Sequence, residues 1–162
     1  MTTTSAPSAP PVTSARSIGW PVAVGAVAFA VALNALGIWG DGTPDGEDSP
    51  LLSFLVVCGF IGVAAVLVFG LFVPRGLKRL AATDRAGVGA VVMSCLALVF
   101  VVAFWTGLPP ILAAGGIVLG HAGRTAARRS GLGTAATVIG ILALVADVAI
   151  YVSDWLSTNG MI

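Results

Sequence analysis

This chain alternates between long apolar stretches and short polar segments. Four of the apolar stretches run over residues 18–39, 51–73, 86–106 and 132–155. A helix needs about 20 apolar residues to cross a bilayer, because it rises about 1.5 Å per residue through a hydrocarbon core about 30 Å thick. Lipid offers the backbone no hydrogen-bond partners, so a crossing segment has to be helical. The pattern therefore predicts an all-α, multi-pass transmembrane helix bundle.

The segment 108–122 is also apolar, but it is short. It begins with Pro109 and Pro110 after Leu108 and ends at Ala122. As a helix it would reach only about 22 Å. The segment could cross in a tilted form, or kinked near Gly115 and Gly116, or it could re-enter on the same side.

The charge distribution favours a crossing of 108–122. Loops on the cytoplasmic side collect Lys and Arg. The segment 40–50 carries four acidic residues and no cation, whereas the cations other than Arg16 gather in 74–85 and 124–129. If 108–122 crosses, every cation lies on one side. We therefore predict five spans, the fourth of them short, with the N-terminus inside and the C-terminus outside. Trp39, Trp105, Trp155 and Tyr151 would then form an outer aromatic belt.

The domain organisation follows from these spans. Residues 1–17 are rich in Ser, Thr, Ala and Pro, which predicts a disordered cytoplasmic tail. The bundle would occupy 18–155 and a short outer tail 156–162. The first apolar stretch exceeds the roughly 7–15 residues of a signal-peptide core, which favours a retained span. A cleaved signal is the alternative.

Composition supports a membrane location. Hydrophobic residues make up 57% of the chain and charged residues 9%, against roughly 25% charged residues in soluble domains. The lipid bilayer is thus the expected partner. The abundance of Ala, Gly and Val, with Arg outnumbering Lys, indicates a bacterial protein of the inner (cytoplasmic) membrane. No basic patch with interleaved aromatics is present, so nucleic acid is not an expected partner.

Residues from about 87 to 148 follow an order that resembles a known family. An apolar span is followed by a Pro-led segment, a basic link and a second span rich in small residues. The most specific parts are Leu119-Gly120-His121 and the link Arg124-Thr125-Ala126-Ala127-Arg128-Arg129-Ser130-Gly131. This order resembles the bacterial membrane family catalogued as domain of unknown function four-one-nine-zero. The resemblance covers less than half the chain and implies a membrane domain without an assigned activity. Asp147 interrupts the second span and is not part of the family pattern.

Asp147 is an acidic residue inside the last predicted span, about 12 Å from Trp155 by helical rise. Such residues mark functional or packing sites. It continues a stripe of small residues at three- and four-residue steps, which indicates that it faces another helix. The stripe consists of Gly133, Ala136, Gly140 and Ala143. The predicted spans contain no cation to pair with Asp147. We therefore predict a neutral carboxyl, hydrogen-bonded to Asn34 at a similar depth or to a polar group of a partner protein.

Other candidate residues fall at helix ends and interfaces. His121 would lie at the cytoplasmic end of the fourth span, as a cap near a helix C-terminus, a pH sensor or a headgroup contact. Arg124, Arg128 and Arg129 would fix topology and face anionic lipid headgroups. Gly116 and Gly120 form a GxxxG pair, which indicates either close packing within the chain or oligomerisation.

The sequence contains none of the motifs that indicate a catalytic, metal or cofactor site. We therefore expect no enzyme and no cofactor. The predicted function is a non-catalytic interaction partner or subunit in the cell envelope, working with a membrane protein partner or as a homo-oligomer. The alternative is a small oligomeric transporter or channel with Asp147 as its proton- or ion-coupling group.

Overall fold

The computed structural model describes residues 13–40, 49–82, 86–125 and 131–161, which form helices and turns and contain no strand. The elements are α1 (Thr13–Gly40), α2 (Pro50–Ala65), the π-helix η1 (Val66–Phe72), α3 (Val73–Ala82), α4 (Ala86–Phe100), the 3₁₀-helix η2 (Val101–Thr106), α5 (Leu108–Thr125) and α6 (Gly131–Thr158). Four helical segments are long and apolar enough to cross a membrane: Gly19–Trp39, Pro50–Arg79, Gly87–Thr106 and Gly131–Thr158. The prediction of an all-α protein with membrane-length helices is confirmed.

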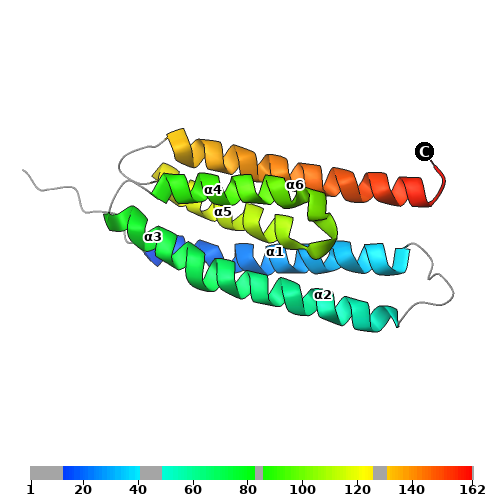
Figure 1. Cartoon of the computed structure of the whole chain (residues 1–162). Coiled ribbons are helices and arrows are strands. Elements are labelled where there is room, and N and C mark those ends of the chain that lie inside the picture. Colours follow the sequence, from blue (N-terminus) through cyan, green and yellow to red (C-terminus); the bar gives the residue numbers. More distant parts are fainter. Residues whose placement is uncertain (1–12, 41–48, 83–85, 126–130, 162) are drawn as a thin grey trace, which may run out of the picture.

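α5 lies in the middle of the bundle, with α1, α2 and α3 on one side and α4 and α6 on the other (Figure 1). From Pro109 to Gly120 every residue except Leu112 and Ile117 is buried. Small residues such as Ala113 and Gly116 have little side chain to keep neighbouring helices apart. The surrounding helices can therefore approach the backbone of α5 closely. α5 is thus the core of the bundle.

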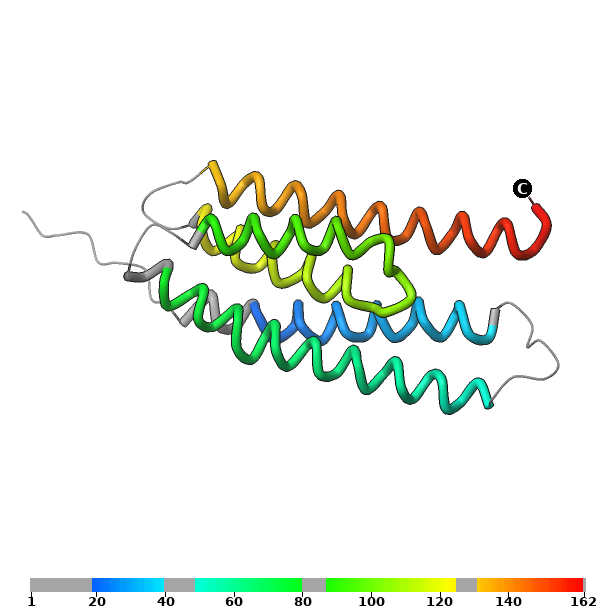
Figure 2. Tube along the Cα trace, viewed as in Figure 1, coloured from blue at the N-terminus to red at the C-terminus, as the bar shows by residue number. Residues whose placement is uncertain are grey.

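α2, η1 and α3 form one continuous helix, and this helix, α4, α5 and α6 each run opposite to the long helix before them (Figure 2). α1 and α6 end at the same end of the molecule, which we call the C-terminal end. α3 and α5 end at the opposite end, which we call the basic end because it carries exposed Arg75, Lys78, Arg79 and Arg124. The turn from η2 into α5 stops short of the ends of α1 and α6 (Figure 1).

The second long helix continues past Pro74, where the sequence predicted its end. The π-helix η1 ends at Phe72, two residues before this proline, and the Val73 N–H donates to the carbonyl of Val68, five residues back. A π turn is wider than an α turn, which makes room for the proline ring and accommodates its missing N–H. The helix therefore extends through α3, whose exposed residues include Arg75, Lys78 and Arg79.

The predicted span 86–106 is kinked near its end. Ala103 departs from helical geometry (φ −107°, ψ 45°), and Gly107 closes the turn with φ 67°. Thr106 stabilises the turn, because its Oγ1 donates to the Ala103 carbonyl at 2.7 Å and accepts from the Leu108 N–H at 3.3 Å. Pro109 and Pro110 then start α5, where their missing N–H groups cost nothing.

The helices at both ends of the chain exceed their predicted limits. α1 begins at Thr13, so residues 13–17 are helical rather than part of a tail, and residues 1–12 lie outside the described residues. α6 continues to Thr158, into the predicted outer tail. Hydropathy marks only the apolar part of a helix, whereas backbone hydrogen bonding can continue beyond it.

Candidate functional site

Asp147 is the most deeply buried ionisable residue among those described. Its exposed fraction is 0%, and neither carboxyl oxygen has a hydrogen-bond partner in the described part of the chain. The predicted bond to Asn34 is wrong. The Asn34 amide instead donates to the Ala30 carbonyl of its own helix at 2.9 Å. An acceptor one turn back is always within reach of a short polar side chain, so the local bond replaces the cross-helix bond.

Asn34 nonetheless lies at the same end of the bundle as Asp147. It is buried, with 5% of its surface exposed, and it borders the turn that leads into α5. A Cβ atom at Gly107 would lie 3.2 Å from Asn34 Nδ2 and 2.7 Å from the Ile61 side chain. Asn34 therefore packs against this turn, and its polar group is satisfied within α1.

The small-residue stripe of α6 packs against α5. Gly133, Ala136, Gly140, Ala143 and Asp147 are all buried, as predicted. A Cβ at Gly133 would lie 2.7 Å from the Gly120 carbonyl oxygen, and one at Gly140 would lie 3.1 Å from the Ala113 carbonyl oxygen. These are backbone-to-backbone approaches that only glycine permits. The prediction that Asp147 lies on an inward-facing stripe is confirmed.

The Gly116–Gly120 pair is also used within the chain. A Cβ at Gly116 would collide with Ser94 Oγ of α4, and one at Gly120 would lie 2.8 Å from the Gly133 carbonyl oxygen. Ser94 Oγ donates to the Ala136 carbonyl at 2.8 Å and so ties α4 to α6 beside Gly116. The GxxxG pair thus packs within the chain in this structure.

Tyr151 is a polar residue near Asp147 that the sequence placed only in the aromatic belt. It follows Asp147 by one helical turn and is half-buried. Its hydroxyl donates to the Phe104 carbonyl at 3.2 Å, and its ring meets that of Phe104 edge to face with centroids 4.9 Å apart. Tyr151 thus fastens α6 to η2 by satisfying a carbonyl of the kinked turn. The sequence could have indicated this position, because a residue four after Asp147 lies on the same face of a helix.

The basic end gathers the remaining candidates. His121 and Arg124 are exposed in the last turns of α5. α3 packs beside them, because a Cβ at Gly76 would lie 2.7 Å from Leu119 Cδ2. Arg128 and Arg129 lie outside the described residues. The structure therefore brings α3 and the end of α5 together.

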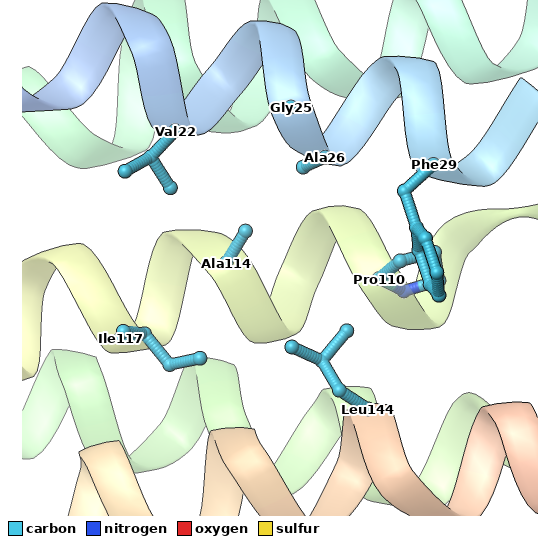
Figure 3. Close-up of a pocket in the computed structure, with 8 residues that line it drawn as sticks. All are labelled: Val22, Gly25, Ala26, Phe29, Pro110, Ala114, Ile117 and Leu144. Carbon is cyan, nitrogen blue, oxygen red and sulfur yellow. The ribbon is translucent and has the colours of Figure 1, made fainter.

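Two apolar grooves flank α5. One, of about 280 Å³, lies between α1 and α5, with Leu144 of α6 at its edge (Figure 3). The other, of about 270 Å³, lies between α2 with η1 on one side and α4 with α5 on the other. Their linings contain no charged side chain.

Groups suited to metal binding are absent from the described residues, where no three His, Cys, Asp or Glu side chains gather. The two cysteines are free, with Cys58 half-buried and Cys95 exposed. Comparison with protein-family models, with curated proteins and with solved structures gives no match. The family resemblance in residues 87–148 stays a prediction.

Proposed function

We propose that this protein is a five-span component of a bacterial cytoplasmic membrane that acts without catalysis, by helix–helix contact with a partner membrane protein. Its N-terminus would lie inside and its C-terminus outside. The direction reverses from α1 to the continuous α2–η1–α3 helix, then at α4, at α5 and at α6, which supports five crossings with α5 as the short fourth span. Arg75, Lys78, Arg79 and Arg124 lie at one end, which the positive-inside rule assigns to the cytoplasm.

The observation that carries the partner role is a pair of open glycines on α2. Gly59 and Gly62 are exposed, and a Cβ at either would meet nothing within 4 Å. In contrast, a Cβ would lie within about 3 Å of a neighbouring helix at each of five buried glycines of α5 and α6: Gly115, Gly116, Gly120, Gly133 and Gly140. Small residues on a membrane helix allow another helix to approach its backbone. An open pair at the outer surface of α2 therefore suits a second transmembrane helix.

A transporter that uses Asp147 has less support. The buried carboxyl is the feature in its favour. Between Asp147 and the basic end, however, α5 and α6 meet through Gly140 against Ala113 and through Gly133 against Gly120. Backbone contacts of this kind leave no room for a substrate along that interface, so we base the proposal on the partner role.

The basic end supplies a second kind of contact in this proposal. The side chains of Arg75, Lys78 and Arg79 on α3 are exposed, and so is that of Arg124 on α5 at the same end of the bundle. Each cation near a membrane surface gains around 1 kcal/mol from anionic lipid headgroups. Anionic lipids are thus the expected partners of this end.

The test is purification of the tagged protein from its native membrane in mild detergent, followed by mass spectrometry of what co-elutes. We expect a membrane protein, either a different chain or a second copy, in fixed ratio. Gly59→Leu with Gly62→Leu should remove it, because the added side chains would hold the partner helix away. Gly89→Leu is the matched control, since Gly89 on α4 is exposed and equally open. Co-elution that survives the double substitution would refute the proposed contact on α2, and the absence of any co-eluting protein would refute the partner role.

A further inference from the structure

We propose that Asp147 is a proton-binding site that exchanges its proton with the C-terminal end of the bundle and not with the basic end. This inference goes beyond the partner role and does not depend on it. It rests on the burial of the carboxyl, on the side chains that follow and precede it along α6, and on the elements packed around it.

The state of Asp147 follows from its surroundings. Its carboxyl is fully buried, and no described donor hydrogen-bonds to it. An ionised carboxylate in such a place would be a buried charge without compensation, which proteins avoid by binding a proton or a cation. A hard metal cation needs about six or more oxygen ligands, and here one carboxyl stands alone. The proton is therefore the ligand that fits.

The face of α6 beyond Asp147 becomes steadily more accessible. Tyr151, four residues on, is half-buried, and Asp154, seven residues on, is exposed. Residues at these spacings lie on one face of a helix. This face thus carries a phenol and a carboxylate from the buried site to the C-terminal end, and both groups can pass a proton.

Between Asp147 and the basic end, the same face of α6 carries no side chain that could pass a proton. Ala143, Gly140, Ala136 and Gly133 are buried against α5. The first side-chain hydroxyl on α6 in this direction is Thr137, ten residues away, or about 15 Å by helical rise. Its Oγ1 donates to the Gly133 carbonyl, and Ser94 Oγ at the same level donates to the Ala136 carbonyl. A proton would have to cross a purely apolar stretch to reach the basic end.

The elements packed against α6 add no competing group near Asp147. These are α1, α4, η2 and α5. From Gly19 to Trp39, α1 has no titratable residue, and η2 has none. The titratable residue of α4 is Cys95, which is exposed, and those of α5 are His121 and Arg124 at its basic end. Among the described residues of α6 and the helices packed against it, Tyr151 and Asp154 are thus the titratable residues that follow Asp147 toward the C-terminal end.

A hydrophobic carbodiimide tests this inference in vesicles. The full chain is reconstituted in one orientation, verified by protease cleavage of a C-terminal tag. A protonated carboxyl adds across a C=N bond of the reagent, with its oxygen bonding to the carbon and its proton going to the nitrogen. The acyl group of this O-acylisourea then migrates from oxygen to nitrogen and gives a stable N-acylurea with no leaving group, whereas a carboxylate without a proton does not react. Mass spectrometry of the α6 peptide then reports the protonated fraction of Asp147. The pH is raised on one side at a time.

We expect the label at Asp147 to fall several-fold when pH is raised on the C-terminal side and to stay constant when it is raised on the other side. Asp147→Asn should abolish this label, with elution of the purified protein unchanged to show that the bundle still folds. Thr137→Val is the matched control and should keep both the label and its response to pH on the C-terminal side, because the Thr137 hydroxyl lies toward the basic end and donates to the Gly133 carbonyl of its own helix. A label that follows the pH on the basic side, on both sides or on neither side overturns the inference.

Discussion

At the scale of single residues, Asp147 shows what a spacing pattern can and cannot predict. The three- and four-residue steps from Gly133 placed it correctly on a buried face, because helical geometry fixes the direction of a side chain. Its bonding partner could not be derived in the same way. Similar depths in two spans suggested Asn34, but the amide had an acceptor within its own helix, at Ala30.

The unpartnered carboxyl leads to a stability prediction. Asp147→Leu keeps the branching of the side chain and removes a buried polar group, which costs about 1–3 kcal/mol without a hydrogen bond. We therefore expect the free energy of unfolding, measured by detergent titration in mixed micelles, to rise by about 1 kcal/mol.

The control for this substitution is Val145→Leu. Val145 is 61% exposed, and an added methylene at a lipid-facing position should leave the free energy of unfolding unchanged. If Asp147→Leu instead destabilised the bundle by more than about 1 kcal/mol, the carboxyl would have a bonding partner and its description as unpartnered would be wrong.

At the scale of elements, the contact of α5 with α6 holds the bundle together through glycines. Gly120 and Gly133 approach each other so closely that a Cβ on either would lie within 2.8 Å of the other's carbonyl oxygen. Close approach lets the two helices gain packing energy along their length, which is the main source of helix association in lipid.

Gly133→Ala should therefore weaken the fold. The new methyl has to push α6 away from α5, and overpacking of this kind costs about 1–3 kcal/mol. Gly131→Ala is the matched control, because Gly131 begins the same helix and a Cβ there would meet nothing within 4 Å. Equal unfolding free energies for the two variants would contradict the close contact.

The sequence predicted how many long helices the chain contains, but it did not predict where each helix ends or bends. Hydropathy located every long helix, since lipid-facing side chains have to be apolar. It could not show that the second helix continues through Pro74, because that depends on the π turn in the preceding residues 66–72. Nor could it show the kink at Ala103, which depends on Thr106 bonding to the backbone.

At the scale of the whole molecule, the central place of α5 was not predicted. The sequence marked 108–122 as short and uncertain, because its Pro, Gly and Ala content lowers its hydropathy. The same composition explains its position, since small residues such as Ala113 and Gly116 suit a helix surrounded by other helices rather than by lipid. Hydropathy measures affinity for lipid, and α5 mostly contacts protein.

The basic end gives a prediction about the whole molecule's surroundings. Arg75→Gln with Lys78→Gln and Arg79→Gln removes three exposed cations of α3, each worth around 1 kcal/mol near anionic headgroups. We expect native mass spectrometry to show fewer anionic lipids retained by this variant than by the unsubstituted protein. Arg16→Gln is the control, since Arg16 does not belong to α3, and equal lipid retention by the α3 variant would contradict the lipid contact.

The central claim is that α5 returns through the membrane, so that the 126–130 link and the end of α6 lie on opposite sides. Cysteine labelling of the full chain in intact cells tests it most directly, after Cys58 and Cys95 are replaced by Ala. With a membrane-impermeant maleimide, Ser157→Cys should be labelled at once, and Ser130→Cys should be labelled only after the cells are permeabilised. Labelling of Ser130→Cys in intact cells, together with Ser157→Cys, would contradict a crossing by α5 and the five-span account with it.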